Sequence, residues 1–241
     1  MNKNVSISSL DAARALSEQI IRWLNQEKER NFYIAVSGGS TPMILFHVWR
    51  EFYMNEIDWS RLQIYWVDER CVDPRDAESN FGMTKKILLD FVPILPNQAH
   101  RIIGEIDPDF AKDRYTKEVL DSAYLENGIP IFDLVLLGVG EDGHTASIFP
   151  GQNNLFTTNE IYAVSLRPMS NSVRITMTGK VITHAKHVVF FVTGAPKAKL
   201  MQEIFEGDEA AKNYPAYYIA KNSNNVTFFL DEGAGRLLTY P

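Results

Sequence analysis

Asp142 and His144 stand two residues apart in a glycine-rich segment, residues 138–151, which reads Gly-Val-Gly-Glu-Asp-Gly-His-Thr-Ala-Ser-Ile-Phe-Pro-Gly. A histidine ordinarily titrates at about pH 6.5, so His144 is suited to take and return a proton, and Asp142 is suited to orient its ring. The apolar run 132–137 predicts a strand buried on both faces, as in parallel sheets, whose ligand sites lie at the carboxyl ends of the strands. We therefore expect catalysis at this turn. The alternative is a histidine that only closes the turn.

The first six residues of this segment also fit the pattern G-x-G-x-x-G of dinucleotide-binding proteins. In those proteins the pattern opens a helix that continues for several turns. Here Pro150 and Gly151 follow within a few residues, so no such helix fits. The sequence therefore disfavours a nicotinamide or flavin cofactor at this site.

A second candidate is the loop Ser-Gly-Gly-Ser-Thr-Pro, residues 37–42, which separates an apolar run from a segment with helical periodicity. Pro42 suits the first turn of a helix, and Ser40 or Thr41 suits its cap. Backbone N–H groups and the positive end of the helix would then face the loop, and glycines allow an anion to approach closely. The alternative is an ordinary tight turn. We expect the backbone of four residues to bind an anionic substrate group: Gly38, Gly39, Ser40 and Thr41.

Asp68, Glu69 and Arg70 follow another apolar run, 62–67. In a parallel sheet this strand end would lie beside the other two, which makes Asp68 a candidate for substrate binding and Arg70 a candidate for stabilising developing charge. Consecutive charged residues also occur in solvated loops, which is the competing interpretation.

Two further basic residues are candidates for binding a phosphate. Strand alternation would turn Arg174 away from the side on which Val173 and Ile175 lie, and Lys197 follows Gly-Ala-Pro at a predicted turn into a helix. Taken alone, each could equally be a solvated side chain.

The periodicity of the chain predicts the elements that position these residues. Helical spacing of apolar residues predicts helices over residues 9–30, 43–52, 79–90, 108–126 and 196–206, with Asn127-Gly128 as the stop of the fourth. Short apolar or alternating runs predict strands over residues 32–36, 62–67, 132–137, 161–165, 173–177, 187–192 and 226–230. This alternation predicts an α/β fold with a mainly parallel sheet and helices on both faces.

The composition suits one large domain, residues 1–241, with 45% hydrophobic residues. A net charge of −6 argues against nucleic acid and anionic membrane partners, and no apolar run is long enough for a membrane span or a secretory signal. Cys71 is the single cysteine, which excludes an internal disulfide and suits a reducing compartment. His184 and His187 lack a third ligand at a convincing spacing, so we expect no metal site. A cytoplasmic monomer is the expectation.

The chain closely resembles 6-phosphogluconolactonases in five blocks that occur in order: Ser-Gly-Gly-Ser-Thr-Pro, Trp-Val-Asp-Glu-Arg, the 138–151 segment, Arg-Ile-Thr and Gly-Ala-Pro-Lys. The His-Thr-Ala-Ser part is the specific one, because the glycine loop is shared with the related glucosamine-6-phosphate deaminases. Those deaminases carry a glutamate that assists sugar ring opening where this chain has Phe149. The segment Tyr-Pro-Ala-Tyr-Tyr, residues 214–218, departs from the Leu-Pro-Ala-Ser type, which leaves its contribution to the pocket open.

The resemblance implies a modified Rossmann-like sheet, no cofactor, and hydrolysis of 6-phospho-D-glucono-1,5-lactone in the oxidative pentose phosphate pathway. In this hypothesis the 38–41 backbone, Arg174 and Lys197 hold the phosphate, and His144 activates water. Arg70 either binds substrate or stabilises the oxyanion. The alternatives are an amino-sugar-phosphate deaminase or isomerase, and a sugar-phosphate sensor without catalysis.

Overall fold

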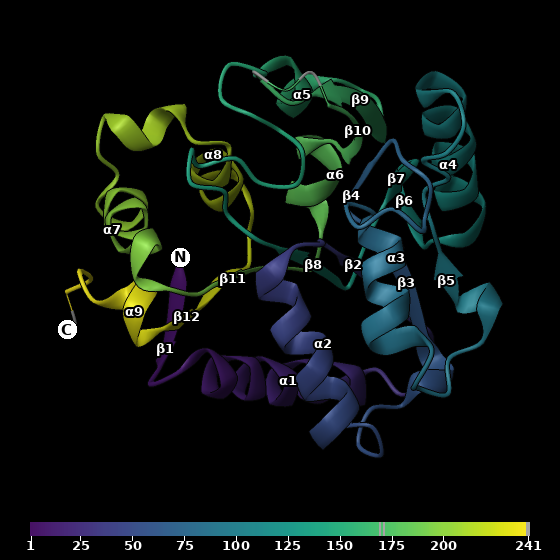
Figure 1. Ribbon diagram of the computed structural model, residues 1–241, viewed down its shortest axis with the longest axis horizontal. Coiled ribbons are helices and arrows are strands. Elements are labelled where there is room, and N and C mark those ends of the chain that lie inside the picture. Colours follow the sequence, from purple (N-terminus) through teal and green to yellow (C-terminus); the bar gives the residue numbers. More distant parts are fainter. Residues whose placement is uncertain (169, 171, 240–241) are drawn as a thin grey trace.

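The computed structural model describes residues 1–168, 170 and 172–239, and its centre is a seven-stranded sheet (Figure 1). All neighbouring strands of this sheet run parallel. Their spatial order is β1 (Asn2–Ser6), β12 (Val226–Asp231), β11 (His187–Val192), β8 (Leu134–Leu137), β2 (Phe32–Val36), β3 (Leu62–Trp66) and β5 (Ala99–His100). The α/β architecture predicted from the sequence is therefore confirmed, and the molecule forms a single domain around this sheet.

Two of the predicted strands lie outside the main sheet. β9 (Tyr162–Leu166) and β10 (Val173–Met177) pair antiparallel with each other, and β10 pairs on its other side with the short strand β4 (Asp68–Arg70). The sequence predicted these strands without specifying their partners, and they form a hairpin, which needs no crossover helix between its strands. This three-stranded sheet brings residues 68–70 and 174 onto neighbouring strands.

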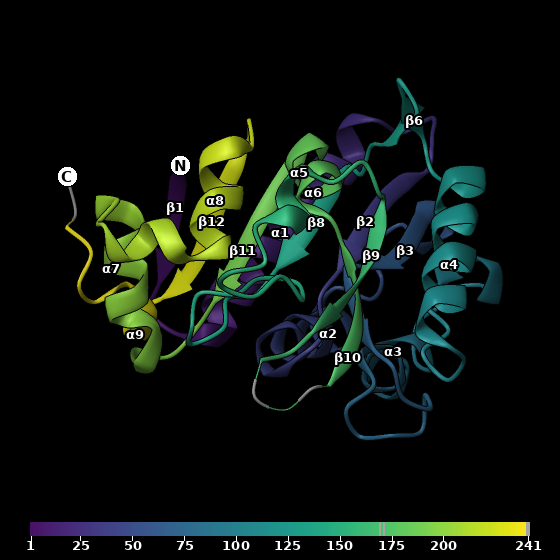
Figure 2. The ribbon, with the colours of Figure 1, turned by 90° about the horizontal axis from the view of Figure 1, so that it is seen from above.

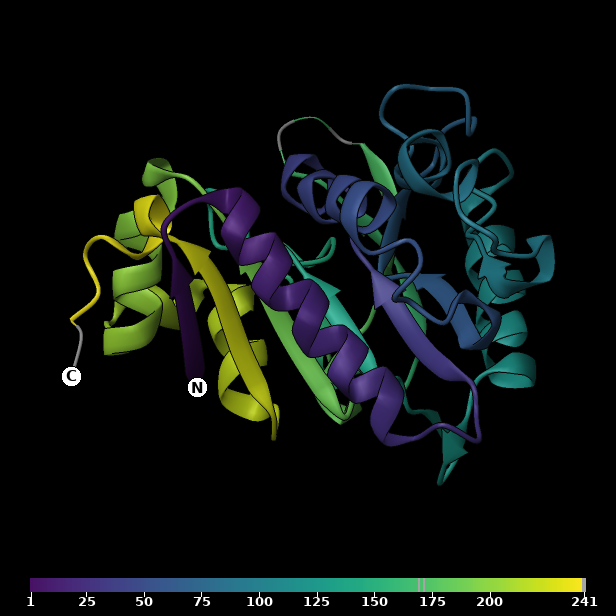
Figure 3. The ribbon, with the colours of Figure 1, turned by 90° about the horizontal axis from the view of Figure 1, so that it is seen from below.

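The helices cover both faces of the main sheet. α1 (Ser9–Gln26) and α2 (Ser40–Phe52) lie on one face, and α6 (Gly179–His184) and α8 (Pro215–Asn222) lie on the other (Figures 1 and 3). The longer of the remaining helices are α4 (Pro108–Ser122), beside the three-stranded sheet, and α7 (Ala198–Glu206), next to α8 (Figure 2). The shorter ones are α3 (Asn80–Thr84), which continues as a π-helical turn over Lys85–Leu89, α5 (Asn154–Thr157) and α9 (Glu232–Gly235).

The fourth helix ends earlier than the sequence predicted. Leu125 and Glu126 pair with Ile129 and Pro130 in the hairpin of β6 (Leu125–Glu126) and β7 (Ile129–Pro130). Asn127 and Gly128 have φ values of 51° and 77°, the positive values that a tight two-residue hairpin turn requires. Asn127-Gly128 is therefore a hairpin turn here, and the helix ends at Ser122.

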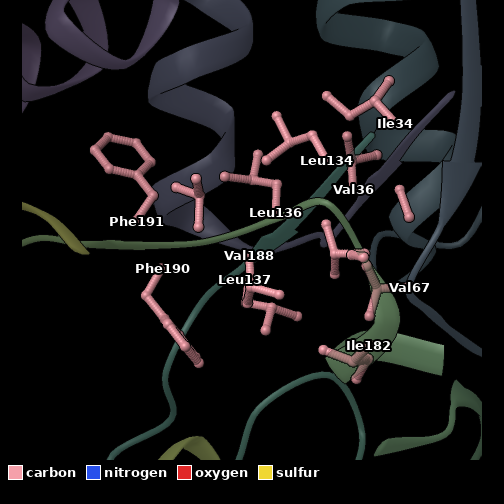
Figure 4. Packing of buried hydrophobic residues seen from close by; sticks show 14 of the residues in the cluster. Ile34, Val36, Val67, Leu134, Leu136, Leu137, Ile182, Val188, Phe190 and Phe191 are labelled. Atoms are coloured by element: carbon pink, nitrogen blue, oxygen red, sulfur yellow. The ribbon is translucent and has the colours of Figure 1, made fainter. Parts of the chain in front are cut away.

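Apolar side chains from both sides of the central strands form the core. Figure 4 shows Leu136 and Phe191 on one side of the strands, and Leu137 and Phe190 on the other, near Ile182 of α6. This arrangement explains why β8 and β11 are continuous apolar runs: each residue is buried whichever face it points to. The rigid strands fix the positions of the loops at their carboxyl ends.

The helices of the described residues include none that is both long enough and apolar enough to span a membrane.

Candidate active site

A pocket of about 220 Å³ lies at the carboxyl ends of β2, β3 and β8. Nine of the ten residues that the sequence pointed to line it, from five segments remote in sequence, whereas Asp142 does not line it but is hydrogen-bonded to His144. The lining is formed by residues 37–42, Asp68, Arg70, Asn80, 138–140, 144–146, Arg174 and Lys197. The fold thus brings the predicted candidates to one place.

Asp142 and His144 form a hydrogen-bonded pair. The Oδ1 atom of Asp142 lies 2.5 Å from Nδ1 of His144 and also accepts the backbone N–H of His144 at 3.1 Å. Burial opposes ionisation of Asp142, but the bonds and charge of His144 outweigh it and lower the pKa of Asp142 to about 2. Because an ionised carboxylate only accepts, Nδ1 must carry the proton, and Nε2 is left with a lone pair that can act as a base.

The ring of His144 rests against Phe149, with 4.7 Å between ring centroids. Phe149 is buried and also lies 5.9 Å from the guanidinium carbon of Arg174. One apolar ring therefore supports both the histidine and an arginine of the pocket.

Ser147 is fully buried, and its hydroxyl donates to the Oδ2 atom of Asp68 at 2.6 Å. The backbone N–H of Ser147 donates to Thr176 on β10 at 3.1 Å. These bonds attach the turn that bears His144 to the three-stranded sheet. Ser147 is fully buried and does not line the pocket, so its hydroxyl cannot reach a substrate as a nucleophile.

The glycine loop leads into α2 without a side-chain cap. Gly39 is the N-cap with a φ of 97°, a value that favours glycine, and Ser40 already belongs to the helix. The prediction that Ser40 or Thr41 caps the helix was therefore wrong. Because the loop turns through a glycine instead, N–H groups of the first turn lack a side-chain acceptor, and the positive end of a 13-residue helix faces the pocket.

The charged residues after β3 have different surroundings. Asp68 accepts from Ser147, whereas Glu69 is buried and accepts the backbone N–H groups of Asn80 and Phe81, each at 2.8 Å. Burial raises the pKa of Glu69 against these bonds. Glu69 thus holds the start of α3, while Asp68 and Arg70 face the pocket.

Arg70 and Arg174 are opposite each other on the antiparallel strands β4 and β10. Arg70 donates to the backbone oxygen of Glu78, but its Nε has no partner among the described residues, and neither has Nε of Arg174. Only 4% of Arg174 is exposed, and its burial, together with the charge of Arg70, lowers its pKa. Two neighbouring cations therefore face the pocket, and the negative charges of Asp68 and Glu78 offset the effect of burial on Arg174 only in part.

Lys197 reaches the same pocket from the turn between β11 and α7. Burial lowers its pKa, and the negative charges of Glu141 and Asp142 oppose this effect. Within the described part of the chain, neither Lys197 nor Arg174 forms an ion pair. A bound anion could therefore contact these cations directly, as the nearby carboxylates do not.

Asn80 is a pocket residue that sequence reasoning missed. It is buried, its Nδ2 donates to the backbone oxygen of Asp68 at 2.8 Å, and its Oδ1 lies against Gly38, where a methyl group would collide with it at 1.9 Å. Gly38 is therefore needed to accommodate Asn80 as well as to form the loop. The only signal in the sequence was a polar residue at a predicted helix start. The contact of Asn80 with Asp68 depends on the conformation of the loop between Arg70 and Asn80, which the sequence does not specify.

Comparison with known proteins agrees with this architecture. The family model described as glucosamine-6-phosphate isomerases/6-phosphogluconolactonase matches residues 8–228, which defines the class of protein. A 6-phosphogluconolactonase of Haemophilus influenzae is 40% identical over 207 residues, covering 86% of this chain and 87% of the relative. The chain belongs to the 6-phosphogluconolactonase family within this larger superfamily.

Solved structures extend the match over the whole fold. The crystal structure of a devB protein superposes with a TM-score of 0.92 at 34% identity, covering 99% of both chains. The 6-phosphogluconolactonase of Trypanosoma brucei superposes with a TM-score of 0.87 at 25% identity, covering 99% of this chain and 98% of the other.

Proposed function

We propose that the protein hydrolyses 6-phospho-D-glucono-1,5-lactone to 6-phospho-D-gluconate. The observation that carries the proposal is a base with a free lone pair, His144 Nε2, on the same pocket as Arg174 and Lys197, which form no ion pair among the described residues. The pocket thus offers a proton acceptor at one point and sites for a dianion at another. A phosphorylated ester needs both, and the family relatives bear the name of this activity.

The phosphate is held by Arg174, Lys197 and the backbone of residues 38–41. Guanidinium and ammonium groups form charge-assisted hydrogen bonds with phosphate oxygens, and the N-terminus of α2 adds N–H donors and a favourable dipole. Anchoring the far end of the substrate places the lactone carbonyl near His144.

His144 acts as general base and then as general acid. Its Nε2 takes a proton from water as the water oxygen attacks carbonyl carbon C1, and Asp142 holds the resulting imidazolium in place. Arg70 stabilises the negative charge on the carbonyl oxygen, and Asp68 accepts a hydrogen bond from the substrate. The intermediate collapses with cleavage of the bond between C1 and the ring oxygen, which takes the proton from His144. The product is the open-chain acid.

A deaminase activity is disfavoured by Phe149, which occupies the place where the related deaminases carry a glutamate. Phe149 is buried against His144 and cannot transfer a proton to a sugar ring oxygen. Incubation with glucosamine 6-phosphate should therefore release no ammonia.

Turnover of freshly made 6-phosphogluconolactone at neutral pH, corrected for spontaneous hydrolysis, tests the proposal. Hydrolysis that depends on the enzyme is the expected result. Binding of 6-phosphogluconate without any turnover above the spontaneous rate would instead identify a sugar-phosphate sensor and refute the proposed reaction.

A further inference from the structure

The turn that presents His144 is closed by few bonds of its own. The N–H of Gly140 donates to the backbone oxygen of His144 at 2.8 Å, and the N–H of Gly143 donates to that of Gly140 at 3.2 Å. Neither bond attaches the outer side of the turn to the rest of the fold. Gly143 is nevertheless buried, so another part of the chain must cover it.

Tyr214 provides this cover. A methyl group on Gly143 would lie 2.4 Å from the Cγ and Cδ1 atoms of Tyr214, so the ring rests directly on the glycine backbone. Gly143 also has a φ of 79°, which an L side chain adopts only with strain. In addition, the N–H of Ala216 donates to the backbone oxygen of Gly143 at 3.0 Å. The start of α8 therefore holds the turn through both a ring and a backbone bond.

The ring is itself fixed from a second helix. The hydroxyl of Tyr214 donates to Oε2 of Glu203 on α7 at 2.7 Å. This bond and partial burial raise the pKa of Tyr214 to about 12, so the hydroxyl remains a donor at physiological pH. α7 begins directly after Lys197, and the six residues from there to Glu203 span about 9 Å of helix. The same helix is thus attached to the pocket at Lys197 and to the His144 turn through Tyr214.

We infer that Tyr214 is a positioning residue of the lactonase reaction, which holds the Asp142–His144 turn in place and is itself anchored by Glu203. It does not line the pocket, so it acts through the turn and not on the substrate. The expected effect of Tyr214 on kcat rests on the proposed function, whereas its contact with the turn does not. A misplaced base slows the proton transfer while the phosphate contacts remain, so the effect belongs in kcat and not in KM.

Steady-state kinetics of two substitutions test this role. Tyr214→Phe keeps the ring and loses the bond to Glu203, and should lower kcat about 2- to 10-fold. Tyr214→Ala also uncovers Gly143 and should lower kcat about 10- to 100-fold, with KM for the phosphorylated lactone unchanged within about twofold.

Substitutions of Glu203, which accepts the hydrogen bond from Tyr214, give a matched pair of variants. Glu203→Gln keeps an oxygen that accepts from Tyr214 and should retain the wild-type kcat, whereas Glu203→Leu should match Tyr214→Phe. Combining Glu203→Leu with Tyr214→Phe should cost no more than either change alone, because both remove the same bond. Tyr217→Phe is the control, since this hydroxyl on the same helix lies near Gly207 and not near the turn.

A measurement that needs no turnover separates this inference from the proposed reaction. The proton on His144 Nδ1, held by Asp142 at 2.5 Å, should give a downfield proton resonance that His144→Ala abolishes. Tyr214→Ala should shift or broaden this resonance while circular dichroism shows a folded protein. Wild-type kcat and an unchanged resonance in folded Tyr214→Ala, or a loss confined to KM, would overturn the inference. If Tyr214→Ala does not fold, the Phe and Glu203 variants decide the question by the same kinetic criterion.

Discussion

Replacing Arg174 or Lys197, the two side chains proposed to bind the phosphate, should lower kcat/KM for the phosphorylated substrate much more than for an unphosphorylated one. Arg174→Met and Lys197→Met keep an apolar stem and delete the charge, which limits packing damage. A charge-assisted hydrogen bond contributes about 1.5–3 kcal/mol, which corresponds to roughly 10- to 150-fold in kcat/KM. Arg174 is 4% exposed and should lie at the upper end of this range, whereas the less buried Lys197 should lie at the lower end.

Comparing 6-phosphogluconolactone with unphosphorylated gluconolactone is the decisive assay. Each variant should lose most of its kcat/KM on the phosphorylated substrate and little on the slow turnover of the other. Part of the loss should appear in kcat, because binding energy from the phosphate helps to place the carbonyl. Lys117→Ala, an exposed lysine on the remote helix α4, serves as the control. Equal losses on both substrates would refute the reasoning, and Arg174 and Lys197 would then support the fold or the reacting carbonyl.

Further predictions concern the base, its pH dependence and the stability of the site. His144→Ala should lower kcat by about 10²- to 10⁴-fold, while binding of 6-phosphogluconate, measured by calorimetry, should stay nearly intact. A folded His144→Ala variant with wild-type turnover would show that His144 is not the base. With His144 present, kcat/KM for unphosphorylated gluconolactone, which carries no titrating phosphate, should rise with pH along one limb of unit slope, because Asp142, with its pKa lowered to about 2, is ionised throughout the assay range and adds no second limb. A flat profile, or a slope of two, would contradict this assignment. In phosphate-free buffer Arg174→Met should raise the melting temperature, since the folded protein no longer buries an unpaired guanidinium; a lower melting temperature would mean that Arg174 is already compensated.

Continuous apolar runs made the parallel sheet predictable. The strands at residues 32–36 and 187–192 were predicted to the residue, because strands buried on both faces need apolar side chains throughout. β1 was missed for the opposite reason: Asn2–Ser6 is a polar edge strand with a partner on one side only, and it has little apolar signal.

Pairing between distant segments was not predictable. β9 and β10 read as strands, but nothing local in their sequences specifies that β10 pairs with residues 68–70, about a hundred residues earlier. The convergence of strand ends in a parallel sheet correctly brought His144, Asp68 and the glycine loop together. It could not show that Arg70 and Arg174 would oppose each other, because their register depends on that long-range pairing.

Two sheets contribute different kinds of donor to the pocket. A parallel sheet presents loops at one edge, which suits backbone donors such as residues 38–41 and the turn of His144. The register of β4 and β10 places Arg70 and Arg174 side by side, because opposed residues on one face of an antiparallel pair lie about 4.5–5.5 Å apart at Cβ. Burial and the positive charge of Arg70 lower the pKa of Arg174, and the negative charges of Asp68 and Glu78 oppose this effect only in part. If Arg174 holds the phosphate as proposed, its pairing with the phosphate should relieve this burial and repulsion, and should favour the occupied pocket over the empty one.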